Sequence, residues 1–191
     1  MIDPRIPQGL GPQRQRILEV ALAELNAGVR EKPRGSNRGE RIDVYVPAWA
    51  RRGRRGPPWC AFFVSWVLAA ALGRVPTGQR RGGCAALTRD ARREELWRGR
   101  DYVPVPGDLF LLDTDGSRGS KGHVGIVLRV SADGERYETV EGNSGHAVRL
   151  GRRERTDLEL AGFVCTVPAE PCPGFERGLV GGFELEQLST R

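Results

Sequence analysis

One apolar segment constrains the fold of this chain more than any other feature. It reads PPWCAFFVSWVLAAALG, residues 57–73, and its apolar residues continue round nearly the whole circumference of a helix. A helix of this kind is buried, so the pattern predicts a central helix that begins at Cys60 and ends at Gly73. The rest of the chain must supply elements that cover it.

The position of Cys60 in this helix has a chemical consequence. In the first turn of a helix the backbone amides lack partners within the helix and the dipole is positive. These two effects lower the pKa of a thiol there, towards the reactive thiolate. A single cysteine is more often a small buried residue, so the nucleophile hypothesis requires a general base elsewhere in the chain.

The periodicity changes along the chain from helical to extended. Helical spacing covers QRQRILEVALAELNAG, a shorter piece around Ile42, and residues 85–97. After residue 106 come short or alternating apolar runs, namely DLFLLD, HVGIVLRV, RYETVEGN and LAGFVCTV. Helices followed by strands predict an α+β domain, in which the N-terminal helices pack on a C-terminal antiparallel sheet in meander order.

The length of 191 residues suits one domain with a substantial core. We expect an N-terminal arm over residues 1–12, a catalytic domain over 13–167 and a Pro/Gly-rich tail over 168–191. No apolar stretch approaches the roughly 18 residues that a membrane span needs, and the first residues do not resemble a secretory signal. These features predict either a cytoplasmic protein or one exported by a non-Sec route.

The net charge and the cysteine content indicate which classes of partner, disulfide and metal site the chain could have. The formal net charge is +6, and Lys32 and Lys121 are the only lysines, so arginine carries the basic character. Such a charge favours nucleic acid, a membrane surface or an acidic wall polymer. The chain has four cysteines (Cys60, Cys84, Cys165 and Cys172), no C-x-x-C motif and two histidines, which predicts neither a disulfide framework nor a metal site. Cys165 and Cys172 are near enough in sequence to bridge, although two free thiols are the favoured interpretation.

The general base and its partner are predicted from two strands. His123 opens HVGIVLRV and shares a strand face with Gly125, whose missing side chain leaves room for close packing. The next strand ends in VEGNSG, where the E-x-N spacing sends Glu141 and Asn143 to one side. Either side chain is suited to accept a hydrogen bond from the imidazole, which would complete a Cys-His-Glu/Asn site.

These blocks resemble a known family. PWCAFFVSWVL, PGDLFLLD, GHVGIVLRV and VEGNSG look like successive parts of a CHAP domain (cysteine, histidine-dependent amidohydrolase/peptidase), within the NlpC/P60 group of papain-like folds. The resemblance implies that Cys60 is the nucleophile, His123 the base, and Glu141 with Asn143 the orienting pair. It also implies cleavage of amide bonds in bacterial peptidoglycan, at the sugar–peptide junction or within stems and cross-bridges, without a cofactor.

The chain departs from the family in two places. Many CHAP domains have Gln or a similar polar residue before the cysteine, where this chain has Trp59, and no Asp-rich calcium loop precedes the nucleophile. We therefore infer no calcium dependence. Candidate substrate contacts are Trp59, His146 and two arginines of the preceding loop, Arg54 and Arg55, although such an arginine run is also typical of a solvated loop.

The expected partner is peptidoglycan or its peptide stems, with an immunity or inhibitor protein added if the chain is a delivered antibacterial effector. We expect a monomer that makes no nucleic-acid or integral membrane contact. Two alternatives remain open at this point. One keeps the catalytic residues but acts on a cytoplasmic amide, and the other is a non-catalytic basic module that binds wall polymer or nucleic acid.

Overall fold

The protein, described here from a computed structural model, has an α+β fold, as predicted. The structure describes residues 2–78, 82–114 and 122–170. Its helices are α1 (Pro12–Asn26), α2 (Ile42–Tyr45), a 3₁₀ turn (Ala48–Ala50), α3 (Cys60–Leu72) and α4 (Cys84–Arg93). Its strands are β1 (Trp97–Arg98), β2 (Leu109–Asp113), β3 (Gly122–Val130), β4 (Arg136–Ser144), β5 (Ala147–Glu154) and β6 (Leu160–Val164).

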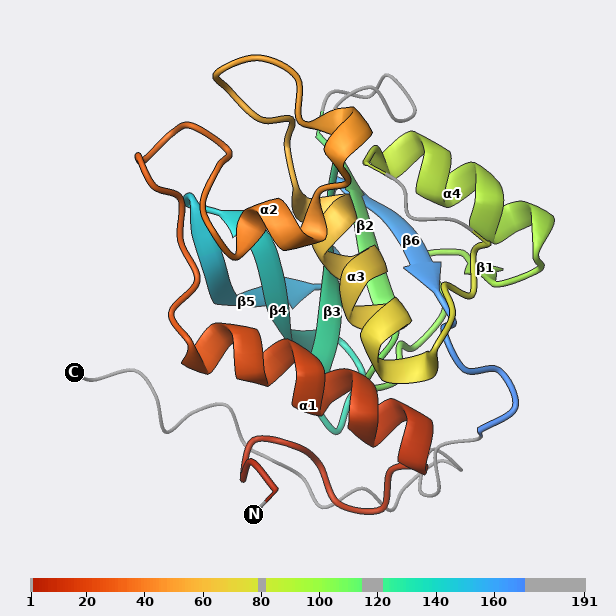
Figure 1. Ribbon diagram of the computed structural model, residues 1–191. Helices are drawn as coiled ribbons and strands as arrows, with labels where there is room; N and C mark the ends of the chain where they lie inside the picture. The colour runs from red at the N-terminus through yellow and green to blue at the C-terminus, as the bar shows by residue number, and fades with distance from the viewer. Residues whose placement is uncertain (1, 79–81, 115–121, 171–191) are drawn as a thin grey trace.

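The strands form one antiparallel sheet in the order β1-β6-β2-β3-β4-β5 (Figure 1). The predicted meander order is correct from β2 to β5. It is wrong for β6, which returns across the sheet to pair with β2. Sequence reasoning also missed β5, because this strand lies at the edge of the sheet and five of its residues are charged or glycine. The helix predicted over residues 85–97 ends earlier, at Arg93, and Trp97 begins β1.

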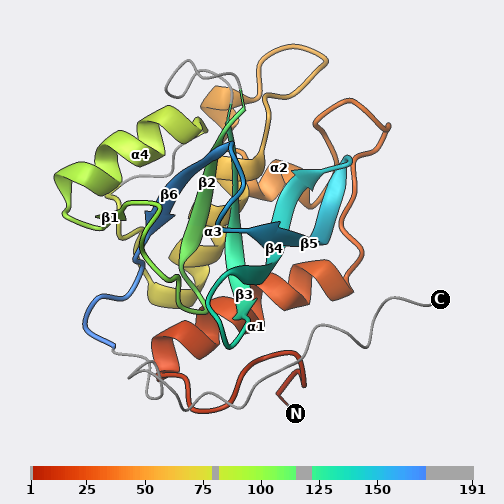
Figure 2. The same cartoon turned by 180° about the vertical axis from the view of Figure 1, so that it is seen from behind.

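Helices α1 and α3 lie against one face of the sheet, where most of the core gathers (Figure 1). The predicted central helix α3 is buried on nearly every side and ends at Gly73, whose φ of 70° suits glycine. The opposite face, seen in Figure 2, carries a smaller cluster that contains Phe110, Leu112, Val127, Tyr137, Leu160 and Phe163. The sheet therefore separates two apolar cores.

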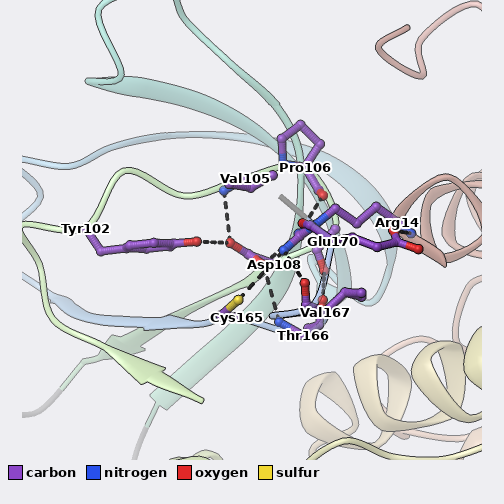
Figure 3. Close-up of polar contacts among 10 residues, drawn as sticks. Arg14, Tyr102, Val105, Pro106, Asp108, Cys165, Thr166, Val167 and Glu170 are labelled. Carbon is purple, nitrogen blue, oxygen red and sulfur yellow. Dashed lines mark hydrogen bonds and ion pairs between the residues drawn. The ribbon is translucent and has the colours of Figure 1, made fainter. Parts of the chain in front are cut away.

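A buried ion pair ties α1 to the sheet (Figure 3). The guanidinium of Arg14 lies 2.8 Å from Oδ1 of Asp108, and the two side chains are 2% and 0% exposed. Arg14 also donates to backbone carbonyls of Pro106 and Val167, each at 3.1 Å. Glu170 accepts from the amide of Arg14 at the start of α1, at 3.3 Å.

The second oxygen of Asp108 is also satisfied. Oδ2 accepts from the hydroxyl of Tyr102 at 2.8 Å and from the amide of Val105 at 2.9 Å. Asp108 therefore organises the turn that enters β2 and anchors α1. No described helix is long and apolar enough to cross a bilayer.

Candidate active site

The site begins at the first turn of α3. Cys60 is the first helical residue and is 4% exposed. The first amide of the helix with an acceptor inside it is that of Phe63, which donates to the carbonyl of Trp59 at 2.8 Å. Amides before Phe63 are therefore available to other acceptors, and the amide of Ala61 donates to the Cys60 sulfur. The sequence-predicted position at a helix start is confirmed.

His123 is brought to Cys60 by β3. Its Nε2 lies 2.9 Å from Oε2 of Glu141 on the adjacent strand β4. Because Nε2 is engaged by this carboxylate, the other ring nitrogen, Nδ1, is left for the hydrogen bond that joins the imidazole to the Cys60 sulfur. The three side chains thus form a connected series from thiol to imidazole to carboxylate.

Glu141 fits into a space that two glycines leave open. A Cβ on Gly125 would lie 2.9 Å from Cγ of Glu141, so the prediction that Gly125 permits close packing is confirmed. A Cβ on Gly151 would lie 2.6 Å from Oγ1 of Thr139 and closer still to Oε1 of Glu141. Glycine at both positions is required for the observed carboxylate position.

Hydrogen bonding and burial shift the pKa values of Glu141 and His123 in opposite directions. Burial raises the pKa of Glu141, but hydrogen bonds from His123, Arg153 and Thr139 outweigh it and lower the value to about 2. Burial lowers the pKa of His123, whereas its hydrogen bonds to Cys60 and Glu141 raise it to about 9. The site therefore holds an imidazolium next to a carboxylate at neutral pH.

The thiol of Cys84 is a further member of this site, a role that was not predicted from the sequence. Cys84 is the first residue of α4 and is 8% exposed. Its S–H donates to the Cys60 sulfur, which lowers the pKa of Cys60, and burial opposes that shift while His123 reinforces it. The same bond, together with burial, raises the pKa of Cys84, so this thiol stays neutral. Its position at a helix start, like that of Cys60, was the available sequence signal.

Asn143 does not share the hydrogen bond of Glu141. The pairing of β4 with β5 is irregular between Glu141 and Ser144, and Asn143 has a φ of 61°. This break in strand alternation removes the basis on which the two side chains were placed together. Among the described residues the half-buried Asn143 side chain has no hydrogen-bond partner, and its orienting role stays a prediction.

Comparison with known proteins agrees with this arrangement. Residues 52–143 match the family model for the CHAP domain. The chain contains a CHAP domain. This family comprises cysteine, histidine-dependent amidohydrolases and peptidases, and the matched segment includes Cys60, His123, Glu141 and Asn143. No curated protein and no solved structure gives a significant match to the chain.

The prediction that Trp59 contacts substrate is wrong for this CHAP domain. Its side chain is 0% exposed, because the ring packs among Tyr45 and Phe63 and Nε1 donates to Oε1 of Glu31 at 3.0 Å. Trp59 therefore holds the start of α3 in place. The exposed aromatic beside the first turn is Trp49, which is 65% exposed and whose ring lies 6.2 Å from that of Phe62.

The other predicted substrate residues lie at the surface of the CHAP domain. His146 is 40% exposed, and its Nδ1 lies 3.1 Å from Oε2 of the buried Glu31. Arg54 and Arg55 are exposed in the loop before α3. Their substrate role stays a prediction. Glu31 joins Trp59 to His146 through hydrogen bonds from both side chains and also lines a cavity.

Two cavities are each lined by a residue that contacts Trp59 or Cys60 at the start of α3. One, of about 400 Å³, is bounded by α4 and β2 and includes Cys84, Arg89, Arg92 and Asp113 in its lining. The other, of about 470 Å³, is bounded by the lead-in loop and β5 and includes Glu31, Arg34, His146 and Arg149. Because Cys84 contacts Cys60 and Glu31 contacts Trp59, one residue separates each cavity from the start of α3.

The remaining predictions from the sequence concern a bridge between Cys165 and Cys172 and the binding of metal ions. Cys165 is a buried free thiol, and Cys172 lies outside the described residues, so the structure does not test a bridge between them. Over the described ranges, no group of three or more His, Cys, Asp and Glu side chains is placed to hold a metal ion.

We predict that Cys60 reacts as a thiolate well below the pH at which an ordinary thiol does. Its lowered pKa means that the rate of alkylation by iodoacetamide, measured by mass spectrometry of the Cys60 peptide, should already be near its plateau at neutral pH. In His123→Ala the rise should move to higher pH, since the imidazolium no longer stabilises the thiolate. A parent rate that climbs about tenfold per pH unit above neutrality would contradict the lowered pKa.

Proposed function

We propose that this protein is a cysteine-dependent hydrolase of amide bonds in bacterial peptidoglycan, either an N-acetylmuramoyl-L-alanine amidase or a stem or cross-bridge endopeptidase. The observation that carries the proposal is the connected series Cys60–His123–Glu141 at the start of α3. The CHAP match supports the hydrolytic chemistry. Membership of a family of wall hydrolases, by resemblance, and the net charge of +6 support the acidic wall polymer as substrate.

The first half of the reaction forms a thioester. The Cys60 thiolate attacks the carbonyl carbon of the scissile amide, and the carbonyl electrons move onto oxygen. The Cys60 amide, in the first turn of α3, is the donor we assign to this oxyanion. As the tetrahedral intermediate collapses, the C–N bond breaks, and His123 gives its proton to the departing amine.

The second half returns the enzyme to its resting state. The neutral His123 accepts a proton from water, whose oxygen attacks the thioester carbonyl. The C–S bond then breaks, the carboxylate product leaves, and the thiolate–imidazolium pair is restored. Glu141 keeps the imidazole in one orientation and stabilises its charged form in both halves.

An extended substrate fits the arrangement of the two cavities. A peptide whose scissile bond lies over Cys60 would reach the cavity beside Cys84 on one side and the cavity beside Glu31 on the other. Arginines line both, which suits a stem peptide with several carboxylates. We assign Trp49, Arg54 and Arg55 to the outer contacts with the polymer, because they are exposed around the loop that leads to the nucleophile.

Digestion of purified peptidoglycan tests this proposal directly. Mass spectrometry of the soluble products should reveal new termini in the parent digest and none with Cys60→Ala. A new N-terminal L-alanine would identify an amidase, and another new amine would identify an endopeptidase. If peptidoglycans of different stem and cross-bridge types all stay intact while a small peptide amide is hydrolysed, the substrate assignment is wrong and the cytoplasmic-amide alternative is favoured.

We expect Glu141→Ala to lower turnover more than Asn143→Ala does, by roughly tenfold or more. The reason is that Glu141 makes a charge-assisted hydrogen bond to His123 and Asn143 does not. Glu141→Gln should keep the shape of the site but shift the basic limb of the pH–rate profile to lower pH, because a neutral amide stabilises the imidazolium less. Full activity of Glu141→Gln together with an inactive Asn143→Ala would reverse the two roles.

A further inference from the structure

A second cation lies behind the carboxylate of the proposed site. Arg153 on β5 donates from Nε to Oε1 of Glu141 at 3.0 Å and from Nη2 to Oε2 at 2.9 Å. This two-pronged contact uses both carboxylate oxygens, and Oε2 is the oxygen that His123 also contacts. A guanidinium bound in this way fixes both the position and the rotation of a carboxylate.

The surroundings of this contact leave it little freedom. Glu141 is 1% exposed and Arg153 is 26% exposed, so the pair is held largely away from water. The hydroxyl of Thr139 donates to Oε1 of Glu141 at 2.7 Å. The guanidinium carbon of Arg153 lies 5.4 Å from the centre of the Phe110 ring, and that ring centre lies 6.1 Å from the ring centre of His123. Phe110 therefore closes the assembly on the side away from α3.

The charges of this assembly are balanced by Arg153. Cys60 and Glu141 are negative and His123 is positive in the reactive state, so without Arg153 the buried set would carry a net negative charge. The other charged or titratable groups that face it are Cys84 from α4, Tyr137 from β4, Asp157 beyond β5 and Arg149, which is the residue of β5 paired with Glu141. Arg149 is the one cation in this list, and its side chain is exposed to solvent.

We propose that Arg153 is a positioning residue of the hydrolytic site, which fixes the orientation of the Glu141 carboxylate and limits how strongly that carboxylate holds the imidazolium of His123. The inference rests on the proposed cysteine-hydrolase chemistry, but not on peptidoglycan as the substrate. The role of Arg153 matters in the step in which His123 gives its proton to the leaving amine. Because the Glu141 carboxylate also binds Arg153, it stabilises the imidazolium less than a carboxylate without that cation would, and the imidazolium releases its proton more readily.

Proton NMR titration of His123 provides a test that needs no substrate. The chain has only two histidines, His123 and His146, which makes the assignment simple. In Arg153→Gln the midpoint for His123 should move upward from about 9, by roughly one pH unit, because a positive charge beside the pair has been removed. Turnover of this variant should fall roughly tenfold, with its basic limb displaced in the same direction.

Two further variants separate positioning from general charge and from structure. Arg153→Lys keeps the charge but loses the fork, so its His123 midpoint should stay near the parental value while turnover still falls. Arg152→Gln is the matched control, because Arg152 is 58% exposed and lies 3.8 Å from Glu138 on the other face of β5. It should leave both the midpoint and turnover unchanged.

The outcomes are distinct. An unchanged or lowered His123 midpoint in Arg153→Gln, or an equal shift in Arg152→Gln, would overturn the proposal even if hydrolysis of peptidoglycan were established. If Arg153→Gln does not fold, as judged by circular dichroism, Arg153→Lys decides alone, and parental turnover in that variant overturns the positioning role. Intact peptidoglycan with the expected NMR shift would instead reject the substrate and keep the role of Arg153.

Discussion

Replacing Cys60 by alanine is expected to abolish amide hydrolysis, with a loss of roughly 10⁴-fold or more, while the fold is kept. In the proposed mechanism the thiolate forms the covalent bond to the substrate, and Cys84, the other described thiol in the site, stays neutral. The measurement is release of soluble fragments from peptidoglycan, with circular dichroism to establish folding. Cys165→Ala is the matched control, because that thiol is buried beside Arg14, away from α3.

The same loss should follow from His123→Ala, and the double variant should be little worse than either single one. Residues that act as one unit in a covalent mechanism do not give additive losses when removed together. Losses that multiply would show that the two side chains work separately, which is incompatible with a proton passing between them. Near-parental activity of Cys60→Ser or Cys60→Ala would exclude Cys60 as the nucleophile.

The largest effect on stability is expected from Asp108→Ala. Removal of this carboxylate leaves the guanidinium of Arg14, which is 2% exposed, without its counter-ion. Loss of one partner of a buried ion pair costs about 3–5 kcal/mol, and here Tyr102 and the amide of Val105 lose their acceptor as well. Urea denaturation followed by circular dichroism measures the change in the free energy of unfolding.

The control for this prediction is an ion pair on the same helix. Arg16 lies 3.2 Å from Glu19, and the two side chains are 58% and 30% exposed. Such a surface pair contributes at most about 0.5 kcal/mol, so Arg16→Ala should change little. The double variant Arg14→Met/Asp108→Leu should lose less than the sum of the single losses, since no unpaired charge remains buried. Equal effects of Asp108→Ala and Arg16→Ala would show that the buried network does not anchor α1.

The fold class and the central elements could be predicted because local patterns determine them. The all-round apolar pattern of residues 60–72 permits only a buried helix, and Gly73 ends it. The return of β6 to β2 could not be read in this way, because strand order depends on contacts between segments far apart in sequence. Strand β5 was missed for a related reason: at the edge of the sheet it needs few apolar residues, and its arginines read as a loop.

Within the site, the residues at the start of a helix or strand could be predicted. The residues whose role depends on a contact with a distant segment of the chain could not. Cys60 and His123 each follow from a position at the start of a helix or strand. Trp59 was predicted to contact substrate because nothing local reveals that Glu31, far upstream, accepts its indole N–H. Arg153 was not singled out, since one arginine among many has no signal until β5 is placed beside β4. The E-x-N spacing did not reveal the irregular strand pairing at Asn143, whose orienting role stays a prediction.

The division of the molecule by its sheet bears on how the chain acquires reactivity as it folds. Cys60 belongs to the core on the helical face, whereas His123 and Glu141 lie on the face of the cluster around Phe110. A folding intermediate with only the first core consolidated would keep the contact between Cys84 and Cys60 but lack the imidazolium of His123, so its thiol would react more slowly than in the complete fold. Fast alkylation therefore marks the moment when both cores have formed, so the nucleophile of this chain serves as a built-in kinetic reporter of complete tertiary assembly.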